Sequence, residues 1–453
     1  MIATLSFAAE SMQGILRGDD NSFDGVSIDS RTIQAGELFV ALSGPNFDGK
    51  KFVSQARGKG AVAAVVDSVV EDEIAQIEVD DSRLALGQLG ATWRGRHAVT
   101  VIGITGSNGK TTLKELTAAC LSAVAPTLAT QGNLNNDIGM PLMMSRIDKT
   151  HQFVILEMGA NHAGEIAYLT SLARPNVVVI TNAAAAHLEG FGSIEDVAHA
   201  KAEILQGNAP PDIAILNADD EYYSYWMSLV ENCDVLSFGL NENADIRADQ
   251  IEIGNDQTCF TLHLPDITLD LTVPLAGAHN VRNACAAAAI ATALDVPSEK
   301  IKAALESIEP IAGRLQSLQS RSGATLYDDS YNANPLSVMA AAEYLVSLPG
   351  ENWLVLGDMA ELGEDAAQMH HDIGESIRKA GVDRLYTFGE LSRNAADAFG
   401  ECASAHESIA ALIEDVSKGL TSDVNVLVKG SRSMRMERVV DALRVPQALG
   451  REA

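Results

Sequence analysis

A strand, a loop with two glycines and a helix follow one another around residue 105, and this segment constrains the fold more than any other. The apolar run Val99–Thr105 predicts a buried strand. After the loop, apolar residues recur at helical spacing: Leu113, Leu116, Cys120 and Leu121. Because Gly106 and Gly109 let the backbone curl, successive N–H groups can point into one concavity at the start of the helix, where anions bind. The segment therefore predicts a phosphate-binding loop.

The residues after the second glycine are those of a triphosphate site. Lys110 supplies a mobile positive charge, and the Thr111 hydroxyl stands where a phosphate loop holds its metal. The strict pattern G-x-x-x-x-G-K-[ST] calls for glycine where this chain has Ile104, so an ordinary strand-to-helix turn is the alternative. The strand before the loop and the helix after it favour the nucleotide site. The predicted nucleotide contacts are Gly106, Ser107, Asn108, Gly109, Lys110, Thr111 and Thr112.

The length of the chain and the order of its elements predict three domains. A chain of 453 residues is long enough for about three. Strands and helices alternate through residues 84–312, which is typical of a parallel sheet with helices on both faces. We predict an α/β protein with a small N-terminal domain (1–83), a central P-loop ATPase domain with a parallel sheet (84–312) and a C-terminal Rossmann-like domain (313–453).

The composition argues against several classes of protein. A net charge of −29 disfavours a nucleic-acid or anionic-membrane surface. No run reaches the ~18 apolar residues of a membrane span, and the N-terminus lacks the basic and apolar segments of a secretory signal. Five scattered cysteines without C-x-x-C spacing indicate reduced thiols. We expect a cytoplasmic monomer that binds anionic substrates through local donors.

Two polar residues follow predicted strands of the central unit. Glu157 ends the apolar run Phe153–Glu157, and His187 comes soon after the strand Val177–Thr181. Both would lie at the carboxyl edge of the sheet, where ligands collect in such folds. A strand-end surface charge and an ordinary loop histidine are the simpler alternatives. Beside a phosphate loop, however, a carboxylate and an imidazole suit Mg²⁺, and we predict that both are ligands.

Further along, the central unit changes character. Lys201 lies in a predicted helix, and a lone helical lysine usually keeps its charge in water, so the residue pattern alone gives it no role. Residues 241–275 alternate in polarity and predict a small antiparallel excursion. The alanine-rich helix that follows begins near His279 or Asn280.

The third unit shows polar clusters at three strand ends. They are Asp328–Asn334, Gly357–Gly363 and Lys429–Arg435. Each could be a plain polar loop, but three at one predicted sheet edge indicate a second ligand-binding rim. Asn334 followed by Pro335 predicts the start of a helix. The expected strands here are Thr325–Tyr327, Trp353–Leu356, Arg384–Phe388 and Val424–Val428.

Taken together, seven runs of the sequence resemble the Mur ligase family, ATP-dependent amide-forming enzymes of bacterial peptidoglycan synthesis. The runs are GITGSNGKTT, NLNNDIGMP, LEMGAN, NAAAAHLEGFGS, AHNVRNA, GRLQ and DDSYNANP. Within the family, DDSYNANP and LGDMAELG are similar to the member that adds D-alanyl-D-alanine. The D-N-P-R run of the relative that adds diaminopimelate or lysine is absent.

The resemblance implies a reaction and a division of labour between the domains. The reaction joins D-alanyl-D-alanine to UDP-N-acetylmuramoyl-tripeptide through an acyl phosphate, with ATP and Mg²⁺. The first unit would grip the uridine diphosphate end, and the third would receive the dipeptide. The substrate contacts expected on this basis are Asp29, Ser30, Arg31, Asn133, Asn135, Asn136, Asn332 and Asn334. On composition alone, residues 29–31 could equally be turn and surface residues.

The resemblance also assigns roles to single residues. Lys110 and Thr111 match the phosphate loop, and Glu157 and His187 match the family's magnesium ligands. Lys201 matches a lysine that several members carbamylate, which would make it a ligand for a second Mg²⁺. Three further residues match the nucleotide contacts: Asn280 on the adenine side, and Arg314 and Asp329 from the third domain.

Three other functions compete with this hypothesis. A ligase that glutamylates a folate would share the phosphate loop but should lack a first unit for a uridine nucleotide. A non-catalytic nucleotide-binding module would use ATP only to set domain geometry. A kinase would leave the third unit without a purpose. ADP formation that depends on both an acyl substrate and an amine would separate these possibilities.

Overall fold

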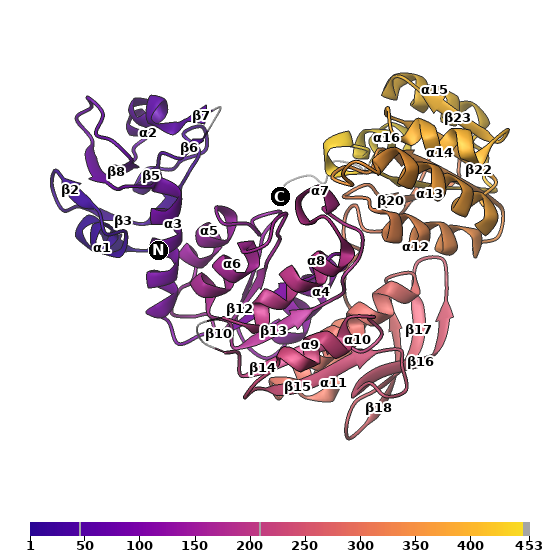
Figure 1. Cartoon of the computed structure of the whole chain (residues 1–453), viewed down its shortest axis with the longest axis horizontal. Helices are drawn as coiled ribbons and strands as arrows, with labels where there is room; N and C mark the ends of the chain where they lie inside the picture. Colours follow the sequence, from indigo (N-terminus) through magenta and orange to yellow (C-terminus); the bar gives the residue numbers. More distant parts are fainter. Residues whose placement is uncertain (45–46, 208–209, 447–453) are drawn as a thin grey trace.

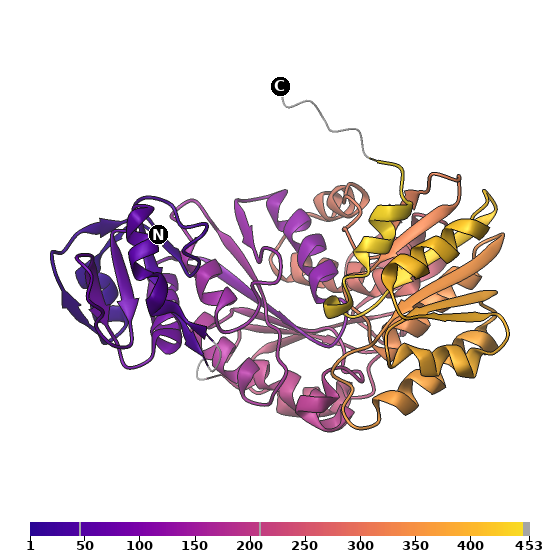
Figure 2. The ribbon, with the colours of Figure 1, turned by 90° about the horizontal axis from the view of Figure 1, so that it is seen from above.

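The computed structural model describes residues 1–44, 47–207 and 210–446, which form three units in a row (Figure 1). The N-terminal unit lies at one end and the C-terminal unit at the other, with the central unit between them in both views (Figure 2). Each unit has its own main sheet, of five, nine and six strands in chain order. The predicted three-domain α/β fold is confirmed.

The N-terminal unit has a sheet in the order β2-β9-β8-β5-β4. Its strands are β2 (Ile15–Arg17), β4 (Gly25–Ser27), β5 (Glu37–Val40), β8 (Ala63–Val66) and β9 (Ala75–Glu78). Helices α1 (Leu5–Ser11) and α3 (Ser82–Gly95) cover one face, and α2 (Val53–Gly58) covers the other. Strands β4 and β5 pair in parallel.

Helix α3 connects the first two units. The Asp81 side chain accepts two backbone N–H groups of the first turn, which explains why the helix begins at Ser82. Leu86 and Leu89 are buried in the N-terminal core, while the helix also packs on α5 (Gly139–Ser145) of the central unit. Because one helix serves both units, the boundary near residue 83 stays a prediction.

The central unit has a nine-stranded sheet in the order β11-β12-β10-β13-β14-β15-β16-β17-β18. Its strands are β10 (Thr100–Thr105), β11 (Thr127–Ala129), β12 (Phe153–Glu157), β13 (Val177–Ile180), β14 (Ile213–Asn217), β15 (Asp234–Gly239), β16 (Ile246–Ile253), β17 (Thr258–His263) and β18 (Thr268–Val273). Strands β10 to β16 pair in parallel, and β16 to β18 pair antiparallel. The parallel sheet and the antiparallel excursion are both where the sequence predicts them.

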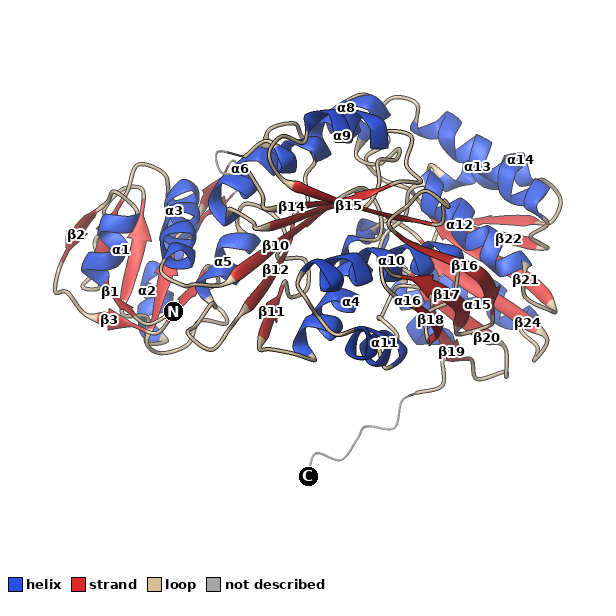
Figure 3. Ribbon diagram, turned by 90° about the horizontal axis from the view of Figure 1, so that it is seen from below, coloured by secondary structure: helices blue, strands red, loops and turns tan. Residues whose placement is uncertain are grey.

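Two hydrophobic cores lie on opposite faces of this sheet. One face is covered by α4 (Lys110–Ser122), α10 (Ala278–Ala293) and α11 (Ser298–Glu306), and the other by α5, α6 (Glu165–Ala173), α8 (Ile194–Ala202) and α9 (Tyr223–Leu229) (Figure 3). A strand with helices on both sides is typically a nearly continuous apolar run, and all four residues of β13 are apolar and buried. The alanine-rich α10 begins at Ala278, close to the predicted start, and packs on α4.

Strand β10 lies where the chain changes direction across the sheet. After β10 the chain crosses through α4 to β11 on one side, whereas β13 leads to β14 and β15 on the other. In open α/β sheets, ligands bind at the carboxyl ends of strands beside such a point. The phosphate loop follows β10 and His187 follows β13, so both lie at this crevice.

The C-terminal unit has a sheet in the order β19-β20-β24-β21-β22-β23. Its strands are β19 (Gln316–Gln319), β20 (Thr325–Asp329), β21 (Glu351–Gly357), β22 (Arg384–Phe388), β23 (Ala403–His406) and β24 (Val424–Lys429). Its helices are α12 (Pro335–Val346), α13 (Ala366–Ala380), α14 (Ser392–Phe399), α15 (Ile409–Gly419) and α16 (Glu437–Leu443). Asn334 caps α12 in a reciprocal capping box with Ser337, which confirms the predicted helix start.

None of the helices in the described part of the chain combines the length and the apolar character needed to cross a membrane.

Candidate nucleotide site

The two glycines of the phosphate loop are required by its backbone. Gly109 has a φ of 83° and Gly106 a φ of 141°, both on the left-handed side that side chains rarely adopt. A Cβ on Gly109 would lie 2.5 Å from Asn283 Oδ1, and one on Gly106 would lie 1.9 Å from Thr181 Oγ1. The loop can therefore lie close to its neighbours only with glycine at both positions.

Residues after β13 hold the phosphate loop in place. The backbone N–H of Ser107 donates to the Asn182 carbonyl at 2.9 Å, and that of Asn108 donates to Asn182 Oδ1 at 2.9 Å. Thr181 Oγ1 donates to the Asn108 carbonyl at 2.6 Å. These bonds between protein groups hold the loop in one conformation, which preorganises it for binding.

Lys110 lies across the loop that precedes it. Its Nζ donates to the carbonyls of Gly106 at 2.5 Å and Ser107 at 3.3 Å. Burial lowers the pKa of Lys110 from its ordinary value, and the charge of Glu157 opposes this effect. Negatively charged phosphate oxygens would attract this ammonium more strongly than the two neutral carbonyls do. A bound phosphate would therefore replace the carbonyls as its partner.

Glu157 is buried without an ion pair among the described residues. It is 2% exposed, and its two oxygens accept hydrogen bonds from Thr111 Oγ1 at 3.1 Å and Asn135 Nδ2 at 2.8 Å. A buried carboxylate with only neutral donors is well suited to a hard cation. The described residues contain no cluster of three or more His, Cys, Asp or Glu side chains that could hold a metal alone. A cation here would need oxygens of a ligand as well.

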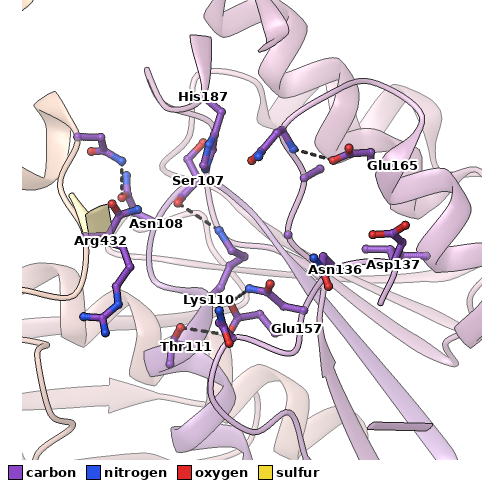
Figure 4. Close-up of a pocket in the computed structure, with 18 of the residues that line it drawn as sticks. Ser107, Asn108, Lys110, Thr111, Asn136, Asp137, Glu157, Glu165, His187 and Arg432 are labelled. Atoms are coloured by element: carbon purple, nitrogen blue, oxygen red, sulfur yellow. Dashed lines mark hydrogen bonds between the residues drawn. The ribbon is translucent and has the colours of Figure 1, made fainter. Parts of the chain in front are cut away.

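A cavity of about 790 Å³ extends from the phosphate loop to α3 and to the C-terminal unit (Figure 4). Predicted site residues that line it are Ser107, Asn108, Gly109, Lys110, Thr111, Asn133, Asn135, Asn136, Glu157, His187, Arg314, Asn332 and Asn334. The sequence reasoning missed others on its wall, among them Arg83, Asp137, Glu165 and Tyr168. Arg83 pairs with Asp137 there. These four come from α3, α6 and the asparagine-rich loop. Only Asp137 lies in a motif run, NLNNDIGMP, and the sequence reasoning gave it no role.

The C-terminal unit contacts the phosphate loop directly. Arg314 Nη2 donates to Thr111 Oγ1 at 3.2 Å, and its guanidinium lies 4.1 Å from the centre of the Tyr331 ring. Asn334 Nδ2 donates to Asn108 Oδ1 at 2.7 Å. Residues more than 200 positions apart in the chain thus meet at the anion site.

The three polar clusters of the C-terminal unit lie together, as the sequence predicts. They follow β20, β24 and β21, which are neighbours in the sheet. The Ala360 backbone N–H donates to Ser431 Oγ at 2.7 Å, and the Ser431 backbone N–H donates to the Asp358 carbonyl at 3.0 Å. Asp329 is paired with Lys429 at 2.6 Å, and it is Lys429 that lines the cavity.

His187 lies at the cavity wall but contacts the other domain. It has a φ of 55° at the start of the short helix α7 (Leu188–Phe191). Its Nδ1 is hydrogen-bonded to a carboxylate oxygen of Glu361, in the LGDMAELG run of the C-terminal unit. The sequence placed His187 at this edge but gave no sign of Glu361 as its partner.

Lys201 is buried, so the expectation of a solvated helical lysine is wrong. The side chain is 2% exposed, and its Nζ lies 5.1 Å from the centre of the Phe191 ring. Burial lowers the pKa of Lys201 to about 7, and the nearby charge of Lys110 acts in the same direction. The packing of α8 on the sheet, rather than any local pattern, buries it.

Several predicted contacts do not line the cavity in the described structure. Gly106 and Thr112 flank the lining residues of the loop, and Asn280 bonds to the Ala276 carbonyl at 2.8 Å. Asp29 pairs with Arg31 on the surface of the N-terminal unit, and the Ser30 hydroxyl donates to Gln55 at 2.9 Å. Residues 29–31 lie between β4 and β5 of the N-terminal unit, whereas the phosphate loop follows β10 of the central unit.

Comparison with known proteins follows the same three-unit division. Residues 22–94 match the model "Mur ligase family, catalytic domain", residues 104–291 the "Mur ligase middle domain", and residues 313–432 the "Mur ligase, glutamate ligase domain". The chain is 42% identical over 443 residues to the UDP-N-acetylmuramoyl-tripeptide–D-alanyl-D-alanine ligase of Escherichia coli, covering 97% of this chain and 98% of that one. The ligase of the same name from Bacillus subtilis is 33% identical, again over 97% and 98%.

Solved structures agree with the sequence comparison. A crystal structure of MurF from Acinetobacter baumannii superposes with a TM-score of 0.91 at 36% identity, over 97% of this chain and 98% of that one. The MurF ligase of Thermotoga maritima, solved in complex with ADP, has a TM-score of 0.81 at 26% identity, over 92% and 96%. Since the similarity spans all three units and includes the phosphate loop, the chain belongs to the Mur ligase family.

Proposed function

We propose that this chain joins D-alanyl-D-alanine to UDP-N-acetylmuramoyl-tripeptide in an ATP-dependent reaction. The observation that carries the proposal is the contact of the C-terminal unit with the phosphate loop, through Arg314 and Thr111, at the wall of one shared cavity. A nucleotide held by the loop would lie where a second reactant bound to the C-terminal unit can reach it. The names of the full-length relatives support the choice of substrates.

The first step converts a poor electrophile into a reactive one. A carboxylate oxygen of the tripeptide attacks the terminal phosphorus of ATP, and ADP leaves, giving an acyl phosphate. The barrier is mainly one of position and charge. Lys110 and the N–H groups of the loop would bind the phosphate oxygens and hold the terminal phosphoryl group in line with the carboxylate.

Magnesium fits the residues at this position. Glu157 and Thr111 would hold the ion, with His187 at the same edge of the sheet. The ion would neutralise charge on the triphosphate oxygens when bound. Asn135 keeps the Glu157 carboxylate in place from the opposite side.

The second step forms the amide. The free amine of the dipeptide attacks the acyl carbon, and inorganic phosphate leaves with the oxygen that came from the carboxylate. Lys429 and Arg432 line the C-terminal side of the cavity and are suited to the dipeptide's carboxylate. Because an acyl phosphate hydrolyses readily, the contacts of Arg314 and Asn334 with the loop would also exclude water.

Lys201 is proposed to carry a carbamate. An amine must be neutral to attack carbon dioxide, and a pKa of about 7 leaves a large neutral fraction at neutral pH. The attack would form an N–C bond, release one proton and place a negative carboxylate-like group on Lys201. With ¹³C-labelled bicarbonate, a carbamate signal should appear in the NMR spectrum of the wild type and be missing from Lys201→Met.

Other expected contacts remain part of the proposal. Asn280 is proposed for the adenine side, and Asp329, which pairs with Lys429, for closure of the third domain on the nucleotide. Residues 29–31 of the N-terminal unit are proposed for the uridine diphosphate end of the substrate. We further propose a cytoplasmic location, where ATP is supplied, and a monomeric state that light scattering after gel filtration can check.

The decisive experiment is to incubate the chain with ATP, Mg²⁺, the tripeptide nucleotide and D-alanyl-D-alanine, and to weigh the product. A mass increase equal to the dipeptide minus water, with one ADP per amide, is the expected result. Replacing the nucleotide substrate by a folate and the dipeptide by glutamate gives the control for the competing ligase. ADP release at the same rate when both the tripeptide nucleotide and the dipeptide are left out would contradict the proposal.

A further inference from the structure

His187 lies in a wall shared by two cavities. One is the large cavity that also contains Glu157 and Lys110. The other, of about 210 Å³, lies between the central and C-terminal units and is lined by Glu361, Ser431 and other residues. An imidazole in this position can present one nitrogen to each side.

The nitrogen on the C-terminal side is already engaged. His187 Nδ1 is hydrogen-bonded to Glu361 Oε2. A carboxylate accepts a proton rather than donating one, so the bond places the imidazole N–H on Nδ1. The lone pair of the ring then resides on Nε2.

The backbone holds both partners in unusual conformations. Glu361 has a φ of 62° and His187 a φ of 55°, both left-handed values that non-glycine residues adopt only where the surroundings impose them. The Glu189 backbone N–H also donates to the Glu361 carbonyl at 3.2 Å. The two loops are therefore joined by a backbone bond as well as by the side chains.

We propose that Glu361 is a positioning residue, supplied by the C-terminal unit, that fixes the tautomer and orientation of His187. Histidines that bind metals commonly donate their other N–H to a carboxylate. Here that carboxylate comes from a different domain, so the tautomer that leaves the Nε2 lone pair free for a metal is held only when the C-terminal unit is docked. The inference rests on the proposed function in one respect, which is the assignment of His187 as a metal ligand.

A purely structural role for Glu361 makes a different prediction. The units are also joined by the Glu189–Glu361 backbone bond and by the contacts of Arg314 and Asn334 with the phosphate loop. Removing the Glu361 carboxylate leaves all three in place. If Glu361 only helped to dock the units, removing its carboxylate would change little. If Glu361 positions His187, removing its carboxylate would release the imidazole.

The first measurement uses the metal-free protein and ¹⁵N NMR of the histidine rings, with the His187 signals identified by their loss in His187→Asn. The wild type should show Nδ1–H. Glu361→Gln should show the same, because the amide oxygen can still accept this proton. Glu361→Ala should show a mixture of tautomers. Glu364→Gln is the matched control, since Glu364 lies three residues away, is exposed and has no hydrogen bond within the described structure. An unchanged tautomer in Glu361→Ala would overturn the inference.

The second measurement is Mn²⁺ binding, followed by electron paramagnetic resonance, in the presence of a non-hydrolysable ATP analogue. Glu361→Ala should bind Mn²⁺ about tenfold more weakly, while Glu361→Gln should stay near the wild type. Equal binding by wild type and His187→Asn would remove His187 from the proposed metal site. Weak binding by His187→Asn together with normal binding by Glu361→Ala would instead overturn only the role of Glu361. Thermal unfolding of every variant verifies that the fold is intact.

Discussion

Two lysines of the central unit, Lys110 at the cavity wall and the buried Lys201, are held in opposite ways. Lys110 donates to two carbonyls of the loop that precedes it, whereas the Nζ of Lys201 lies over the ring of Phe191. Burial lowers the pKa of both. Lys110 has polar partners within four residues, and Lys201 owes its burial to packing between distant segments. A sequence motif can encode the first arrangement but not the second.

The largest effect is expected from Lys110→Ala. It removes the ammonium that would meet the developing negative charge on the transferred phosphoryl group, so the rate of ADP formation should fall by about a thousandfold or more. Steady-state ADP release measures this. Lys149→Ala, at an exposed lysine, is the control and should retain the wild-type rate. ADP release by Lys110→Ala close to that of the wild type would refute the role of Lys110.

Lys201→Met tests the other half of the comparison through stability. The folded-state pKa of about 7 lies below the unfolded-state value of 10.5, so between these pH values the unfolded chain holds a proton that the folded chain lacks. Wild-type stability should therefore rise with pH across this window. Below pH 7 the stability of the variant relative to the wild type should exceed its value above pH 10.5 by roughly 5 kcal/mol, since one pKa unit corresponds to about 1.4 kcal/mol.

Urea unfolding from pH 6 to pH 10, in buffers free of carbon dioxide, checks this prediction. The advantage of Lys201→Met should shrink as the pH rises toward 10. A constant difference across the range would mean that the Lys201 ammonium is not destabilised by burial. The same variant should lose ligase activity if the carbamate is required.

Glu157→Gln sharpens the comparison by removing a carboxylate whose charge raises the pKa of Lys110. The amide keeps the shape but binds a cation less well, so the Mg²⁺ concentration for half-maximal rate should rise by about tenfold. Glu165→Gln, at another cavity-lining glutamate, should leave the Mg²⁺ titration unchanged. Identical titrations for Glu157→Gln and the wild type would exclude Glu157 as a ligand.

The smallest effect is expected at Asn334, which has two functions. It caps α12 and donates to Asn108 in the phosphate loop. Asn334→Ala should lose about 1 kcal/mol of stability from the missing cap. Asn334→Ser keeps a capping hydroxyl but not the bond to Asn108, so it should retain stability and raise the KM for ATP. Equal KM values for Asn334→Ser and the wild type would show that this contact does not assist nucleotide binding.

Much of the fold is legible in the sequence because local patterns encode it. The strands β10, β12 and β14 are largely apolar runs that end in a polar residue, and β13 is an apolar run followed by one. The start of α12 is marked by Asn334 and Pro335. The phosphate loop is encoded in the same way, since its glycines are needed for its own backbone. These features depend on residues that are near one another in the chain.

The rest of the site depends on contacts between distant segments. Glu361 meets His187 across 174 positions, and Arg314 meets Thr111 across 203. No local spacing marks such pairs, and a solitary lysine such as Lys201 looks like any surface residue until the packing of α8 is known. For residues 29–31 the structure adds as little as the sequence, because nothing in their local structure indicates what they bind.

The central claim is that the phosphate loop delivers a phosphoryl group to the carboxylate of the peptide substrate. It is tested most directly by labelling that carboxylate with ¹⁸O and analysing the released phosphate by mass spectrometry. If an acyl phosphate forms, one labelled oxygen should appear in inorganic phosphate for every amide made. Amide formation with unlabelled phosphate would contradict the account.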